Sequence, residues 1–87
     1  MKRRLEWEPE ARADLLALGR RDQRQAERIR LAMHRYASES IGDVVKLTDR
    51  AGLYRLRVGD WRVLFAFEDG GLIVLALRVL NRRDAYR

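Results

Sequence analysis

Hydrophobic residues near the start of the chain recur at helical spacing. Ala11, Leu15 and Leu18 are separated by four and then three residues, which predicts an amphipathic helix. Pro9 suits the first position of this helix, because the missing N–H of proline costs little there. Gly19 is expected to end the helix, since glycine readily takes the left-handed conformation that follows many helices.

A second apolar stripe predicts another helix over residues 22–37. Its members recur mostly three or four residues apart, and they are Ala26, Ile29, Met33, Tyr36 and Ala37. The link to the first helix is short, which favours an antiparallel pair of helices. A loop is expected over residues 38–43.

The rest of the chain alternates between apolar and polar residues, as strands do. Strands are expected over residues 2–7, 44–47, 53–58, 61–68 and 72–79. A polar, basic tail follows from Leu80 to Arg87. The pattern predicts an α+β fold in which an N-terminal helical hairpin packs on a small, mainly antiparallel sheet, as one domain over residues 1–87.

A two-residue turn at Gly59-Asp60 is expected to gather arginines on one face of the sheet. In such a hairpin Arg57 lies opposite Arg62, and Arg55 shares their face because side chains alternate. The aromatic residues of the hairpin lie on the other face, which is the better candidate to cover the helices. Like charges opposite each other destabilise a sheet. Either a nearby carboxylate neutralises the arginines, or the cluster binds a phosphate.

The position of Arg78 depends on the turn before the last strand. If residues 69–71 form a three-residue loop, Arg62 faces Arg78. That register also places four apolar residues on the core face: Ile73, Leu75, Leu77 and Val79. A two-residue loop would turn every side chain of the strand to the opposite face. We therefore expect Arg78 beside Arg62, with three more residues arriving from the tail: Arg82, Arg83 and Tyr86.

The charge of the chain indicates an anionic partner. It has 19 Lys and Arg residues against 13 Asp and Glu, a formal net charge of +6. Nucleic acid, an acidic protein segment and a membrane surface all fit this charge. Only Lys2 and Lys46 are lysines, and the other 17 basic residues are arginines. This excess reflects either a coding bias or selection for bidentate phosphate contacts.

Other features of the composition exclude several kinds of protein. The absence of cysteine excludes a disulfide scaffold, a thiolate metal site and a cysteine nucleophile. His34 is the only histidine, so no multi-histidine metal site can form, and we expect no metal and no cofactor. No apolar run reaches the roughly 18–20 residues that span a bilayer. The charged N-terminus lacks the apolar core of a signal peptide, so a cytoplasmic protein without membrane partners is expected.

Three segments of the chain together resemble the RelE/ParE toxin superfamily of type II toxin–antitoxin systems. They are Lys46-Leu47, the hairpin LYRLRVGDWRVL at residues 53–64, and VLNRRDAY at residues 79–86. With Trp7 and the helical hairpin, the resemblance covers nearly the whole chain. It implies a RelE-like fold of two N-terminal helices on a twisted, mostly antiparallel sheet. It also implies a cognate antitoxin that wraps and neutralises the toxin and binds operator DNA, so that operator DNA is a partner only through the antitoxin.

Two activities are known in this superfamily. RelE-like members are mRNA interferases, usually acting on mRNA in the ribosomal A site, whereas ParE-like members inhibit DNA gyrase. The short chain and the arginines of the hairpin favour a RelE-like endoribonuclease whose partners are mRNA and the ribosome. The alternatives are a gyrase inhibitor without nuclease activity and a catalytically weak toxin homologue.

The resemblance also implies roles for single residues. Arg55 and Arg57 match the family's basic pair, and Arg62 matches the arginine that contacts the scissile phosphate. Arg82 matches the basic general-acid position, and Tyr86 matches a tyrosine that orients or stacks on a base.

Three further residues are expected to bind substrate: Lys46, Arg78 and Arg83. The best-known members carry lysines where Arg55 and Arg57 stand, and a guanidinium is a poor base. The site would therefore depend on electrostatic stabilisation by arginines and on positioning of the RNA by the ribosome.

Overall fold

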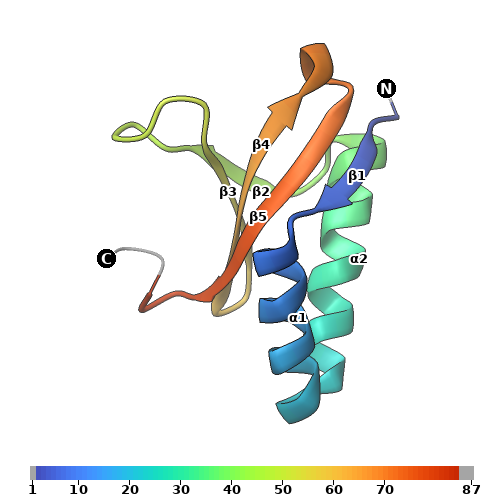
Figure 1. Cartoon of the computed structure of the whole chain (residues 1–87), viewed down its shortest axis with the longest axis vertical. Helices are drawn as coiled ribbons and strands as arrows, with labels where there is room; N and C mark the ends of the chain where they lie inside the picture. The colour runs from blue at the N-terminus through green and yellow to red at the C-terminus, as the bar shows by residue number, and fades with distance from the viewer. Residues whose placement is uncertain (1, 85–87) are drawn as a thin grey trace.

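Two helices lie side by side against one face of a five-stranded sheet in the computed structural model, which describes residues 2–84 (Figure 1). The elements in chain order are β1 (Arg4–Trp7), α1 (Pro9–Arg21), α2 (Gln23–Glu39), β2 (Asp43–Lys46), β3 (Tyr54–Val58), β4 (Trp61–Glu68), a 3₁₀ turn (Asp69–Gly71) and β5 (Ile73–Asn81). The α+β class and the helical hairpin are confirmed. None of the described helices is long and apolar enough to cross a membrane.

The break between the helices lies at Asp22, so the helix end expected at Gly19 is wrong. Asp22 leaves the helical conformation with φ −154° and ψ 89°, and its backbone N–H donates to the carbonyl of Leu18. Its side chain accepts a hydrogen bond from the backbone N–H of Gln25 at 3.1 Å. Aspartate therefore ends one helix and caps the next, which makes a glycine stop unnecessary.

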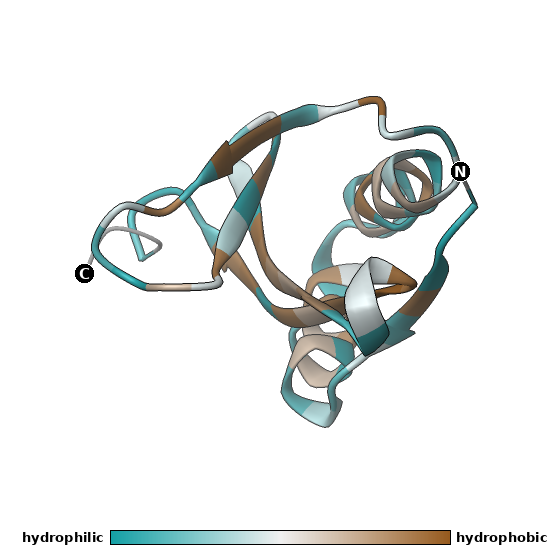
Figure 2. Cartoon of the chain, turned by 90° about the horizontal axis from the view of Figure 1, so that it is seen from above, coloured by the Kyte–Doolittle hydropathy of each residue, from teal (hydrophilic) through white to brown (hydrophobic). Residues whose placement is uncertain are grey.

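The strand order in the sheet is β1-β5-β4-β3-β2, and β1 pairs with β5 in parallel while the other pairs are antiparallel. The core lies between this sheet and the helices. Its fully buried large side chains come from α2 and the central strands: Ile29, Met33, Leu56, Val63, Phe65 and Val74. Figure 2 shows hydrophobic residues concentrated along the strands. The helices therefore cover one face of the sheet, because the core side chains of α1 and α2 pack against those of β3, β4 and β5.

The register of β3 and β4 is the one that the two-residue turn predicts. Arg57 pairs with Arg62, and Val58 pairs with Trp61. Gly59, at the first turn position, has φ +61°, a conformation that favours glycine. The arginines of this hairpin therefore do share one face of the sheet.

The expected register of β4 and β5 is wrong. Glu68 pairs with Ile73, so residues 69–72 form a four-residue connection instead of a three-residue loop. The register then shifts again between Leu64 and Phe65 of β4, where β5 contains one extra residue. As a result Arg62 faces Leu80 instead of Arg78.

The shifted register changes which residues of β5 enter the core. Val74 and Ala76 lie opposite the core residues of β4 and are fully buried. Of the four residues expected there, only Val79 belongs to the main core cluster. A β-bulge of this kind re-aims the side chains on either side of it, and apolar alternation alone does not reveal it because the strand is apolar on both faces.

Candidate nucleic-acid interface

Three arginines occupy the face of the sheet that the helices leave uncovered. Arg55 and Arg57 lie on β3, and Arg62 lies on β4 directly opposite Arg57. The residues that alternate with them, including Leu56 and Val63, are buried in the core beneath the helices. We call Arg55, Arg57 and Arg62 the arginine face.

Arg62 is held by the turn that brings it opposite Arg57. Its side chain folds back, and Nη1 donates hydrogen bonds to the carbonyl oxygens of Gly59 at 2.8 Å and Trp61 at 2.9 Å. The residue is only 7% exposed, and its buried Nε has no hydrogen-bond partner. Two backbone carbonyls thus fix the plane of the guanidinium. A buried guanidinium N–H without a partner is costly to the stability of the fold.

Asp43 supplies the carboxylate nearest to Arg57. It lies on β2 opposite Arg57, and its Oδ2 is 4.0 Å from Arg57 Nη1. Both side chains are more than half exposed, at 60% and 59%. At this distance and exposure the ion pair contributes little to stability. A carboxylate that could neutralise the arginines, one of the two alternatives left open by the sequence, is therefore present on the neighbouring strand β2. It binds Arg57 only loosely.

The tail returns to the turn between β3 and β4. The backbone N–H of Arg82 donates to the carbonyl of Asp60 at 2.8 Å, and Arg82 Nη1 lies 3.8 Å from Asp60 Oδ1. Arg82 and Arg62 therefore contact adjacent residues of one turn, although 20 positions separate them. Tyr86, a further tail residue expected at the site, lies outside the described residues.

Lys46 is not brought to the arginine face. It pairs with Tyr54, whose neighbour across β4 is the core residue Phe65. Directly paired residues point to the same side of a sheet, so Lys46 points to the side of the helices. His34 is exposed on α2, which also lies on that side.

Arg78 is bound by a carboxylate that the sequence interpretation missed. Its Nε and Nη2 donate to the two oxygens of Asp14 at 2.8 and 3.2 Å, and Glu10 lies 3.8 Å from its Nη1. The hydrogen bonds that Arg78 donates to Asp14 raise the pKa of Arg78 above its ordinary value. Arg78 therefore remains protonated and is paired with α1 rather than placed beside Arg62.

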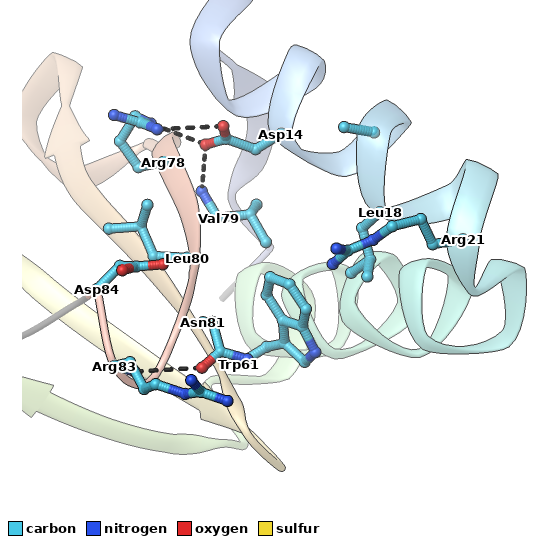
Figure 3. Close-up of a pocket in the computed structure, with 11 residues that line it drawn as sticks. Asp14, Leu18, Arg21, Trp61, Arg78, Val79, Leu80, Asn81, Arg83 and Asp84 are labelled. Carbon is cyan, nitrogen blue, oxygen red and sulfur yellow. Dashed lines mark hydrogen bonds and ion pairs between the residues drawn. The ribbon is translucent and has the colours of Figure 1, made fainter.

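Asp14 also accepts a hydrogen bond from the backbone of β5, at a position where β5 has no neighbouring strand on that edge. β1 pairs with β5 only as far as Ala76, and the backbone N–H of Val79 beyond that point donates to Asp14 Oδ2 at 2.8 Å (Figure 3). Asp14 follows Ala11 by three residues and precedes Leu18 by four, so it lies on the apolar stripe of α1. An acidic residue on an apolar stripe is the signal by which this contact could have been found.

Removing Asp14 is expected to loosen the attachment of α1 to β5. We expect Asp14→Ala to lower the free energy of unfolding by about 2 kcal/mol, because it removes a charged hydrogen bond and leaves the N–H of Val79 without its acceptor. Asp14→Asn should cost about 1 kcal/mol, because the amide oxygen can still accept from Val79 while the partly screened ion pair is lost. Urea denaturation monitored by circular dichroism measures both values.

The matched control is Glu10→Gln, which removes the exposed carboxylate at 3.8 Å from Arg78. It should change stability by less than about 0.5 kcal/mol. Equal effects of Asp14→Ala and Glu10→Gln would contradict a specific role for Asp14.

A groove opens on the helix side of the sheet, at the end where β4 begins and β5 ends (Figure 3). Its volume is about 700 Å³, and α1, β4, β5 and the tail all contribute to its walls. It contains two of the arginines expected at the site, Arg78 and Arg83, together with Arg21 and Trp61. The structure thus separates the expected arginines into two groups: the arginine face with Arg82, and Arg78 with Arg83 in this groove. Among residues 2–84, no three His, Cys, Asp or Glu side chains are grouped so as to hold a metal ion.

Comparison with known proteins identifies the family. The family model for the ParE toxin of the type II toxin–antitoxin system parDE matches residues 5–86. The chain belongs to this toxin family. A search of curated proteins gave no match.

Solved toxin structures share the fold. The toxin–antitoxin complex RelBE2 of Mycobacterium tuberculosis is 27% identical with a TM-score of 0.69, covering 97% of this chain and 95% of that one. The archaeal RelE–RelB complex of Pyrococcus horikoshii is 22% identical with a TM-score of 0.75, covering 97% and 99%. The YoeB/ParE toxin of Agrobacterium tumefaciens is 19% identical with a TM-score of 0.76, covering 90% and 96%. The chain is thus a type II toxin with a RelE-like fold, as its sequence indicated.

Proposed function

We propose that this toxin is an endoribonuclease that cleaves mRNA on the ribosome, in the cytoplasm, and that the arginine face binds the scissile phosphate. The observation that carries the proposal is the direct pairing of Arg57 with Arg62 on the uncovered face of the sheet. Two like charges facing each other are unfavourable without an anion between them. A phosphate accepts hydrogen bonds from two guanidinium groups at once.

Cleavage by this route uses the 2′-hydroxyl of the RNA as the nucleophile. The oxygen attacks the adjacent phosphorus, a pentacoordinate phosphorane with added negative charge forms, and the bond to the 5′-oxygen breaks. Arg62, whose plane is fixed by the carbonyls of Gly59 and Trp61, is suited to stabilise this charge. Arg82, held at the same turn, is suited to donate a hydrogen bond to the departing 5′-oxygen, which takes its proton from water.

We assign proton transfer from the 2′-hydroxyl to Asp43. A guanidinium has no site that accepts a proton, whereas a carboxylate has two oxygens that do. Asp43 lies opposite Arg57 on the same face of the sheet, and its long 4.0 Å ion pair leaves it exposed. The proposal thus assigns to β2 the base that the arginines cannot supply.

The toxin is expected to act weakly on free RNA. Its arginines stabilise charge, but the uncovered sheet face offers nothing that forces the 2′-hydroxyl into line with the departing oxygen. The ribosome holds mRNA in a fixed conformation and supplies that alignment.

A cognate antitoxin is the proposed protein partner. The complexes of P. horikoshii and M. tuberculosis contain toxin and antitoxin together. On this chain an apolar groove of about 500 Å³ runs along the helices, and it includes the exposed Leu16. Three arginines border it: Arg12, Arg20 and Arg30. An amphipathic helix with acidic flanks fits such a surface, and operator DNA would be bound through the antitoxin.

The deciding experiment compares free and ribosome-bound mRNA. Purified toxin is added to an mRNA alone and to the same mRNA in stalled 70S complexes, and cleavage is mapped by primer extension. We expect cleavage within the ribosomal A site at a rate at least about 100-fold above that on free RNA, the scale that positioning readily supplies. Equal rates with and without ribosomes would contradict the proposal.

Gyrase inhibition is the second candidate, because the family model that matches is that of ParE toxins. In this case the arginine face would bind the enzyme or its DNA without catalysis. A supercoiling assay with purified gyrase separates the two functions. Loss of supercoiling together with intact mRNA on ribosomes would establish the second function and exclude the first.

A further inference from the structure

The groove on the helix side has the features of a nucleotide-binding site. Trp61 is the first residue of β4, and its side chain both packs against the core and lines the groove. In Figure 3 the guanidinium groups of Arg21 and Arg83 are seen on either side of this indole. The volume of about 700 Å³ is within the range of small-molecule sites.

The two arginines beside Trp61 are available to a ligand. Arg21 lies in the last turn of α1, Arg83 lies in the tail, and both are exposed. Neither side chain forms an ion pair or hydrogen bond within residues 2–84, whereas the third arginine of the groove, Arg78, is bound by Asp14. Among the described residues that line the groove, Asp14 pairs with Arg78, which leaves the carboxylate of Asp84 against the two guanidinium groups of Arg21 and Arg83. The groove therefore carries a net positive charge.

Asn81 adds a polar group with a defined orientation. Its Oδ1 accepts the backbone N–H of Arg83 at 3.2 Å. The amide nitrogen of the side chain therefore keeps its donors for another partner. A nucleobase offers an aromatic face for Trp61 and acceptor atoms on its edge for Asn81, and its phosphate suits Arg21 and Arg83. An acidic peptide would use only the arginines.

We propose that this groove binds one nucleotide of single-stranded RNA, with the base stacked on Trp61 and a phosphate bound by Arg21 and Arg83. The inference rests on the proposed function for its choice of RNA. Consecutive tail residues connect the two sites, because Arg82 is bound at the β3–β4 turn and Arg83 lines the groove. An RNA strand that crosses this end of the sheet can therefore contact the arginine face and the groove together.

The fluorescence of Trp61 provides a direct test in the full-length toxin. The chain has two tryptophans, so Trp7→Phe leaves Trp61 as the only one. We expect a single-stranded RNA trinucleotide to quench this fluorescence saturably, because stacking places the base on the indole. Arg21→Gln and Arg83→Gln should together weaken the binding about tenfold or more, the effect of losing charged hydrogen bonds to a phosphate. Arg24→Gln combined with Arg35→Gln, which changes two exposed arginines outside the groove, is the charge-matched control and should change nothing.

Calorimetry on proteins that keep both tryptophans avoids dependence on the Trp7 variant. The Arg21/Arg83 double variant should again bind the trinucleotide about tenfold more weakly than the parent toxin. Trp61→Leu should lose a similar factor, since one stacked base contributes on that scale. Absence of quenching, or affinities unchanged in the groove variants, would overturn the inference. A glutamate-rich peptide that quenches Trp61 equally and competes with the RNA would overturn it too, by making the groove a peptide site.

The inference and the proposed function fail in different ways. The quenching of Trp61 reports on the groove, because Trp61 lines the groove and no residue of the arginine face does. If the groove binds RNA and the toxin does not cleave ribosome-bound mRNA, only the proposed function is wrong. If the toxin cleaves and the groove variants bind and cleave like the parent, only the groove assignment is wrong.

Discussion

Replacing Arg62 by alanine is expected to reduce mRNA cleavage on the ribosome by about 100- to 1,000-fold, the usual cost of removing one preorganised donor from a charged transition state. Arg62 is the most buried arginine of the face, and two carbonyl contacts orient it before substrate arrives. Primer extension on stalled ribosomes measures the rate, and growth after induction reports toxicity. Both should show nearly complete loss.

Loss of the carbonyl contacts also affects folding, so the Arg62 prediction needs two controls. Arg62→Lys keeps the charge but cannot form the same fork, and it should remain folded while losing most of the activity. Antitoxin binding and thermal melting of each variant report whether the fold is intact. A folded Arg62→Ala toxin that retains full toxicity would exclude Arg62 as the phosphate contact.

Asp43→Asn is expected to lower the rate of cleavage by about 100-fold, the lower end of the effect of removing a general base. The change keeps the shape of the side chain but removes its ability to accept a proton. Stability should hardly change, because the 4.0 Å ion pair with Arg57 is exposed on both sides. The rate is measured with saturating toxin on ribosome-bound mRNA, so that weaker binding does not contribute.

A double-mutant cycle separates this role of Asp43 from a merely structural one. If Asp43 acts only by holding Arg57, then Asp43→Asn will have no further effect once Arg57 has been replaced by glutamine. If Asp43 accepts the proton, the same loss will appear with either residue at position 57. Glu39→Gln is the matched control and should leave the rate unchanged, since that carboxylate is 60% exposed and pairs with Arg35 on α2. If Asp43→Asn lowers the cleavage rate only in the toxin that keeps Arg57, and not in the Arg57→Gln variant, the assignment of Asp43 as the base is wrong.

The parts of this protein that local sequence determines were predictable. Apolar spacing located both helices, and the Gly59-Asp60 turn fixed the pairing of Arg57 with Arg62, because a two-residue turn leaves the flanking strands one register. The arginine face follows directly from that register. The family resemblance, carried by the same hairpin, agreed with the family assignment of residues 5–86.

Contacts between distant segments were decided by tertiary structure. The β4–β5 register depends on a four-residue connection and a bulge, and an apolar strand fits either register equally well until the sheet and helices pack together. This choice moved Arg78 away from Arg62 and toward Asp14, which lies 64 positions earlier in the chain. Spacing along one element cannot reveal such a pair.

The sequence by itself determined that this protein carries arginines on a hairpin face within a RelE-like toxin fold, because helices and tight turns are set by neighbouring residues. Only the tertiary structure decided which carboxylates meet those arginines. Asp43 joins the arginine face through pairing between strands, Asp14 removes Arg78 from it, and the tail divides Arg82 and Arg83 between two surfaces. Charges act through space, so their partners are fixed only when distant segments have packed.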